Sequence, residues 1–211
     1  MLEHVRNAIG EALDSVRSYT NDAGRYWSNI QRFDKFERRQ DFREPDDPSW
    51  QSFAAAHWDD SLRKLQMDRP RVVAEFAEDT SGGLGSYRVR VVEFPITPYV
   101  QWELHALKIR AECGENIRII SPGAIGQYET GAPVPELIFM GKLAMYEVVY
   151  DEFGVLRGAR KFLDSKLIEG CLADVQSLYG LGEELGTFFE REVAPLPPPS
   201  IGKNPVDSQE L

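Results

Sequence analysis

The sequence predicts an α+β fold, in which a helical N-terminal part precedes a mixed β-sheet built from a βαβ unit and a hairpin and flanked by helices. Apolar residues recur at helical spacing before Ser81, whereas short β-branched segments separated by turn residues dominate after Gly85. The 211 residues suffice for one large domain or two small ones. We therefore expect a helical part over residues 1–80, an α/β domain over 86–193 and an extended Pro-rich tail over 194–211.

The composition is that of an acidic globular protein. Hydrophobic residues make up 42% of the chain and charged residues 27%, which excludes wholesale disorder and disulfide-dense secreted folds. The net charge of −10 disfavours direct binding of nucleic acid, because an acidic surface repels phosphates. Charges interrupt the first twenty residues, and no later segment is long and apolar enough to span a membrane. We expect no membrane association and a cytoplasmic location.

Three helices and a short fourth are expected before Ser81. An apolar stripe with alternating spacings of three and four predicts a first helix of about five turns. This helix either packs on the protein's own body or forms a homodimer seam or a docking site for a protein partner. A second helix is expected around Trp27 and Phe36, a third after the N-cap Asp47 and Pro48, and a short one restarting at Pro70. The stripe of the first helix consists of Leu2, Val5, Ile9, Ala12, Val16 and Tyr19.

The remainder of the chain predicts strands and helices in alternation. A strand from Tyr87 to Phe94, a helix capped by Thr97 and running to about Cys113, and a strand from Ile117 to Ile120 predict a βαβ unit with parallel strands. Turn residues then separate three further strands, and Asp164 is the expected N-cap of a helix that precedes a last one. The three strands are expected over residues 137–140, 143–150 and 155–162.

The motifs that usually mark catalysis or cofactor binding are incomplete. The glycine-rich segment 82–85 precedes a strand, whereas a phosphate-binding loop follows one, so it predicts a hinge. The three histidines lie far apart, and Cys113 and Cys171 lack the spacing of a metal site. We therefore predict no catalytic residue, no metal site and no cofactor.

The helix after Thr97 carries the most informative pattern. At 100° per residue, Glu103 and Arg110 fall within an otherwise apolar arc. Buried charges need partners, and these two lie about 10 Å apart along the helix axis, so each needs another residue. Thr97 and Tyr99 lie where a strand ends and a helix begins, a common ligand position in open α/β sheets. The ligand-binding candidates are Arg90, Thr97, Tyr99, Glu103, Arg110 and Arg118, which form either an anion pocket or a structural ion-pair network.

Three segments of this region carry a resemblance: YRVRVV at 87–92, PITPYVQWEL at 95–104 and GENIR at 114–118. Over roughly residues 33–193 the chain resembles an uncharacterised actinobacterial family of domains of unknown function, often encoded beside helix-turn-helix regulators. The C-terminal layout is also similar to one half of a phospholipase D-like domain. That fold's catalytic His-x-Lys pattern is missing here, so this similarity implies a degenerate, non-catalytic copy.

These observations favour a non-enzymatic cytoplasmic regulatory or interaction protein, acting with a helix-turn-helix regulator or as a dimer. One alternative is a hydrolase or phosphodiesterase that acts on an anionic small molecule. Another is a sensor that binds such an anion without turnover in the Arg/Glu pocket. The absence of a paired nucleophile and base favours binding over catalysis.

Overall fold

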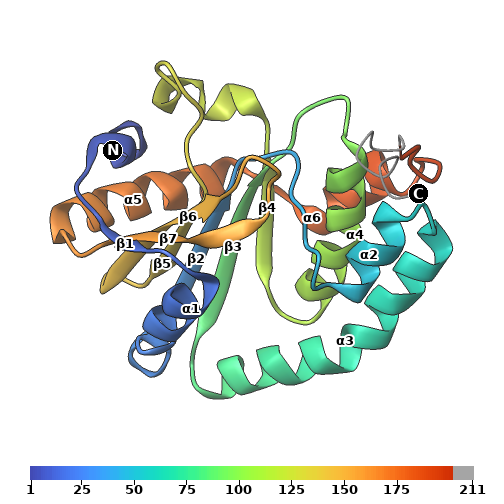
Figure 1. Cartoon of the computed structure of the whole chain (residues 1–211), viewed down its shortest axis with the longest axis horizontal. Coiled ribbons are helices and arrows are strands. Elements are labelled where there is room, and N and C mark those ends of the chain that lie inside the picture. Colours follow the sequence, from blue (N-terminus) through green and yellow to red (C-terminus); the bar gives the residue numbers. More distant parts are fainter. Residues whose placement is uncertain (202–211) are drawn as a thin grey trace, which may run out of the picture.

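The computed structural model describes residues 1–201 and contains a mixed eight-stranded sheet with helices on both faces (Figure 1). This arrangement confirms the predicted fold class. The strand order is β1-β7-β6-β5-β2-β3-β4-β8, in which β2, β3 and β4 are mutually parallel and all other neighbours are antiparallel. The strands are β1 (Glu11–Leu13), β2 (Arg32–Glu37), β3 (Gly85–Val91), β4 (Asn116–Ile120), β5 (Leu137–Met140), β6 (Ala144–Tyr150), β7 (Leu156–Phe162) and β8 (Glu183–Glu184).

The helices divide between the two faces of the sheet. On one face, α5 and the N-terminal 3₁₀ turn η1 pack on aliphatic and aromatic residues of the central strands. On the other face, α4 and α6 cover β4, while α1 covers β6 and β7. The helices are η1 (Leu2–Asn7), α1 (Val16–Gly24), η2 (Trp27–Asn29), α2 (Pro48–Ala54), α3 (Trp58–Ser81), α4 (Pro98–Glu112), η3 (Pro122–Ala124), η4 (Gly126–Tyr128), α5 (Ser165–Leu181), α6 (Leu185–Phe188) and the π-helical η5 (Phe189–Val193).

The predicted helix caps are confirmed. The side chains of Asp47, Thr97 and Asp164 accept backbone N–H groups at 2.8, 3.1 and 2.8 Å, which fixes the first turns of α2, α4 and α5. The βαβ unit is also confirmed, since β3 and β4 are parallel neighbours joined through α4. Ala194 and Pro195 form a turn after η5, residues 196–201 belong to no helix or strand, and the remainder of the expected tail, 202–211, lies outside the described residues.

The single first helix predicted over residues 2–19 is wrong. Leu2 and Val5 lie in η1 and are buried against α5 within the chain's own core, so they form no dimer seam. Ile9 is fully exposed, and β1 then adds to the edge of β7. Gly10 explains the break, because a Cβ there would lie 2.9 Å from the ring of Phe162. A capping box at Ser15 starts α1 afresh.

The second predicted helix is also wrong. Phe33 and Phe36 belong to β2, a central strand between β5 and β3, so residues 1–80 are not all helical. Their spacing of three fits a helix, but in the strand the two rings point to opposite faces of the sheet. The chain does not restart at Pro70 either. This proline lies inside α3, where burial of Val72 and Phe76 holds the following turns in place.

Candidate functional site

A large cleft lies on the face of the sheet that carries α1 and α4, with a volume of about 1160 Å³. Strands β2 and β3 form its floor, α4 and α3 form one side, and residues of α1, η2, β6 and β7 line the other. Helix α3 runs along this side of the molecule toward the start of β3 (Figure 1). The connection between β2 and α2, residues 42–47, borders the cleft as well.

The floor of the cleft is charged because both of its strands alternate. On β3, Arg88 and Arg90 point to the face that carries the cleft and α4, whereas Val89 and Val91 enter the core under α5. On β2, Lys35 and Glu37 lie directly beside Arg88 and Arg90 in the parallel register. Adjacent strands thus place charged side chains next to one another on one face.

Each floor arginine is paired with a carboxylate. Arg90 is fully buried and donates through Nε to Glu103 of α4 at 2.8 Å and through Nη1 to the Arg39 carbonyl at 2.5 Å. Arg88 donates through Nη1 to Glu37 at 2.5 Å and through Nε to Glu115 at 2.7 Å. Buried guanidinium groups need such partners, since removing one leaves an uncompensated charge.

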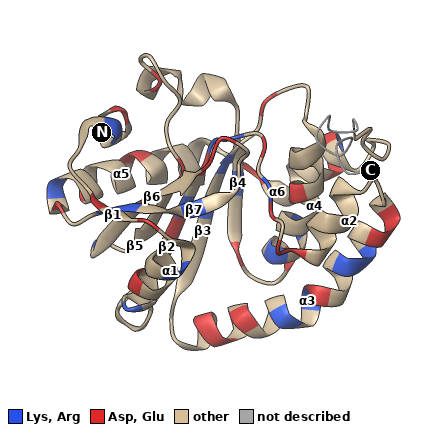
Figure 2. Cartoon of the chain, in the orientation of Figure 1, with Lys and Arg blue, Asp and Glu red and all other residues tan. Residues whose placement is uncertain are grey.

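The ion pairs continue from the floor to the outer side of the cleft. Arg110 of α4 donates to Glu115 at 2.6 Å and to Glu75 of α3 at 3.0 Å. Arg71 then links Glu75 to Asp68 along α3. Acidic and basic residues are interspersed along this helix in Figure 2. An unbroken chain of alternating charges therefore ties the sheet to α4 and α3.

Burial shifts the pKa values of several carboxyl groups. Burial raises the pKa of Glu103 to about 7, with the Glu37 carboxylate adding to the effect and Arg90 opposing it. Burial likewise raises the pKa of Glu136 to about 7, although its carboxylate accepts the backbone N–H groups of Arg38 and Arg39. Of the two groups, Glu103 lines the cleft, and carboxyl groups with raised pKa values in clefts are typical of functional sites.

Aromatic side chains border the end of the cleft at which Glu44 lies. The ring centroid of Phe42 lies 5.5 Å from that of Tyr99 and 4.7 Å from that of Tyr150. The Tyr99 hydroxyl donates to Glu44 at 2.6 Å, and burial raises the pKa of Glu44 despite this bond. Carboxylates and aromatic faces therefore occur together in one part of the cleft.

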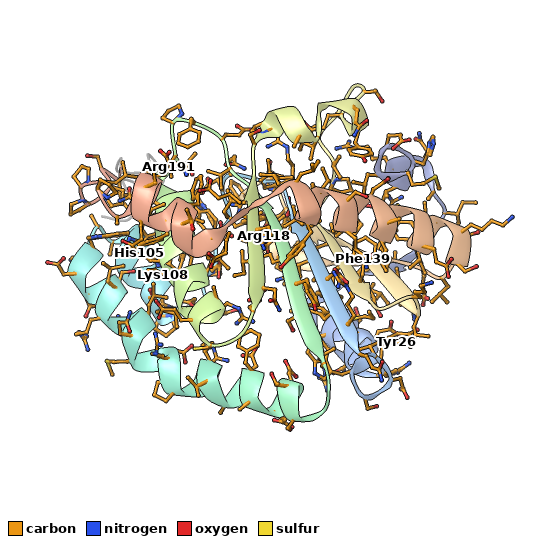
Figure 3. All side chains as sticks on the ribbon, turned by 180° about the vertical axis from the view of Figure 1, so that it is seen from behind. Tyr26, His105, Lys108, Arg118, Phe139 and Arg191 are labelled. Carbon is orange, nitrogen blue, oxygen red and sulfur yellow. The ribbon has the colours of Figure 1, made fainter. Side chains whose placement is uncertain are left out.

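The predicted site residues separate into two groups. Tyr99, Glu103 and Arg110 line the cleft, and Arg90 lies behind it bound to Glu103, as expected for a residue that pairs with that buried carboxylate. Thr97 caps α4 and donates to the Gln40 carbonyl at 2.7 Å. Arg118 lies on the opposite face, with its guanidinium 5.5 Å from the Tyr179 ring of α5 (Figure 3). The ion-pair partners of Arg110 are Glu115 and Glu75.

Sequence reasoning missed the carboxylates that complete the site. Glu37 comes from β2, at the end of the segment in which the sequence predicts the second helix, and Glu44 comes from the connection between β2 and α2. Glu115 directly follows Gly114 at the end of α4, and Glu136 precedes β5. The alternation Arg88-Val89-Arg90-Val91 is the signal that could have found the charged floor, because it places two arginines on one face of a strand.

The described lining of the cleft contains more acidic than basic side chains. Within residues 1–201, the lining contains six basic and nine acidic residues and neither histidine nor cysteine. No group of three or more His, Cys, Asp or Glu side chains in the described part of the chain could hold a metal ion. None of the helices over residues 1–201 is long and apolar enough to cross a membrane.

Comparison with known proteins identifies a family without an assigned activity. The family model described as a domain of unknown function, DUF6879, matches residues 21–190, and the chain therefore belongs to this family. The chain matches no curated protein and no solved structure.

Proposed function

We propose that this DUF6879 protein is a non-catalytic binding protein whose cleft receives a segment of a partner polypeptide. The observation that carries the proposal is a cleft of about 1160 Å³ in which the lining cations Lys35, Arg88 and Arg110 are each engaged by a carboxylate. Clefts for small molecules have volumes of about 300–1000 Å³, so this one has room for a longer ligand.

The charge balance favours this role over binding of a small anion. An anionic substrate at Arg88 or Arg110 would have to displace Glu37, Glu115 or Glu75 from its arginine. The buried carboxylates would then lose their partners, which costs several kcal/mol by order of magnitude. A hydrolytic mechanism further needs a nucleophile next to a base, and the Ser49 hydroxyl in the lining bonds Ser61 and the Trp102 indole rather than an acid–base side chain.

A regulatory role is part of the proposal. The resemblance found in the sequence implies a helix-turn-helix regulator as partner, and a cleft that binds a polypeptide segment supports an interaction of this kind. The N-terminal segment is not the proposed docking element, because Leu2 and Val5 are buried within the chain.

Selection from a random peptide library tests the proposal without assuming the chemistry of the ligand. We expect the wild-type protein to enrich a peptide family and the Ala106→Trp variant, which fills the cleft from α4, to lose it. The Ala173→Trp variant is the matched control, since Ala173 is exposed on α5 at the opposite face. Circular dichroism checks that both variants are folded. Failure to enrich any peptide, or equal loss in both variants, would contradict the proposal.

A further inference from the structure

The end of the cleft that holds Glu37 and Glu44 has the composition of a receptor for a positive charge. Both carboxylates line the cleft together with the rings of Phe42, Tyr99 and Tyr150. The second oxygen of Glu37 is buried and accepts no hydrogen bond within residues 1–201. A buried carboxylate oxygen without a donor is unfavourable, so a ligand that brings a donor would stabilise it.

The aromatic rings add a second attraction for a cation. The guanidinium of Arg39 already lies 5.5 Å from the Phe42 ring centroid and 5.3 Å from that of Tyr150. These distances are within the range of cation–π attraction. A further cation that enters from the cleft would meet the same group of rings beside two carboxylates. Arg88 and Lys35, which lie 2.5 and 3.3 Å from the Glu37 carboxylate, are the positive charges that such a ligand must accommodate.

Acidic residues also extend along the outer side of the cleft. Asp68, Glu75 and Asp79 of α3 line it, and their spacings of seven and four place them on one side of the helix. The eleven residue-to-residue steps from Asp68 to Asp79 span about 16 Å at a rise of about 1.5 Å per residue. Arg71 already pairs with Asp68 and Glu75, so basic residues of an extended chain would share these carboxylates with it along the row, whereas a small amine would use one end of the row. A second copy of this protein is disfavoured, because two chains of net charge −10 repel each other.

We propose that the cleft binds a basic polypeptide segment and that one of its lysine or arginine side chains lies against the rings of Phe42, Tyr99 and Tyr150, beside the carboxylates of Glu37 and Glu44. This inference rests on the proposed function and specifies the ligand. The cation of the ligand lies near the Glu37 and Glu44 carboxylates, and flanking basic residues lie along α3.

Fluorescence anisotropy with labelled peptides of lysine, leucine and serine tests the assignment. We expect the lysine peptide to bind at least about tenfold more tightly than matched peptides in which glutamine or glutamate replaces lysine, since hydrogen bonds to charged groups are the stronger ones. Added salt should weaken binding because surface charges are screened. Spermidine should compete poorly. Competition as strong as that of the peptide would assign the site to free polyamines and overturn the polypeptide assignment.

Two variants with the same change of charge locate the contact. Glu44→Gln keeps an acceptor for the Tyr99 hydroxyl and should weaken binding of the lysine peptide about tenfold. Glu169→Gln removes one negative charge from the exposed surface of α5 and should leave binding unchanged. Equal weakening by both variants would show unspecific attraction to an acidic protein and overturn the assignment. If the library selection instead yields neutral or acidic peptides that Ala106→Trp rejects, the binding role stands and the basic ligand is wrong.

Discussion

The two faces of the sheet are built from the same strands, but one buries apolar side chains and the other carries ion pairs. Under α5 and η1, residues such as Val89, Val91 and Phe139 pack into a core without ion pairs among them. On the other face, Arg88 and Arg90 lie beside Lys35 and Glu37 in the register, and Arg88 pairs with Glu37 while Arg90 pairs with Glu103. The first arrangement stabilises by removing apolar surface from water. The second buries charged groups, whose ion pairs contribute little net stability because removing the charges from water offsets their attraction.

The difference indicates where function lies. A face needed only for stability gains more from apolar packing than from buried ion pairs, since replacing such pairs by well-packed hydrophobic residues is often neutral or stabilising. The charged face of this sheet also borders the cleft, whereas the apolar face is covered by α5. We infer that the charges serve the cleft. The following predictions test how differently the two faces respond to change.

The largest expected effect is on the charged face. Glu103→Ala leaves the guanidinium of the fully buried Arg90 without its carboxylate, and we expect the free energy of unfolding to fall by about 3–5 kcal/mol. Urea unfolding measures it. Glu75→Ala is the control, because the Glu75 side chain is 37% exposed and its ion pairs should contribute less than about 1 kcal/mol. Equal losses of unfolding free energy in the two variants would show that the buried ion pair of Arg90 and the exposed ion pairs of Glu75 contribute alike to stability.

The charged face should also make stability depend on pH. Burial raises the pKa of Glu103 and Glu136 from 4.5 to about 7, so between these values the folded protein keeps protons that the unfolded chain has released. Raising the pH from about 5 to about 7 should therefore lower stability, by at most about 3 kcal/mol for each group.

Unfolding of the wild type and of Glu136→Gln across this range checks the pH dependence. His105 acts in the opposite direction, since burial lowers its pKa, and the difference between the two proteins isolates Glu136. Glu37 and Glu115, whose pKa values are lowered by their arginines despite burial, lose their contribution only as the pH falls below about 4.5. Parallel pH profiles of wild type and variant would rule out the contribution of Glu136.

On the apolar face, truncation should cost less and show no pH dependence. Leu2→Ala removes a buried side chain from the contact between η1 and α5, and we expect a loss of about 2 kcal/mol, at the low end for leucine because the chain end can relax. Thermal unfolding measures this loss. Ile9→Ala, at a fully exposed position, should change nothing. If Ile9 lay in a dimer interface, Ile9→Ala would instead lower the apparent mass measured by light scattering.

The smallest effect is expected at the tail. Pro197 accepts a hydrogen bond from Gln101 at 2.9 Å, and Ile201 packs on the cluster around α4. Ending the chain after Val193 should therefore lower stability by about 1 kcal/mol, the usual contribution of a single hydrogen bond. A loss as large as that of Glu103→Ala would place the tail within the structural core.

The sequence by itself determined the elements whose signals are local. Asp47, Thr97 and Asp164 marked helix starts through their own capping bonds, and the charges of Glu103 and Arg110 within an apolar arc predicted buried ion pairs. These features depend on neighbours within a few residues. The βαβ order and the later strands followed from the same short-range patterns.

Only the tertiary structure decided which strand joins which and which charges meet. Phe33 and Phe36 fit a helix as well as a strand, and pairing of β2 with β3 and β5 settled the choice. Glu37, Glu115 and Arg88 are far apart in the chain, so their contact depends on the register of the sheet and the end of α4. Arg118 resembles Arg90 in sequence, but the register between β3 and β4 pairs Arg118 with Val89 and turns it away from the cleft. Local spacing cannot encode such pairings, because the side to which a strand residue points depends on the alignment of its neighbours.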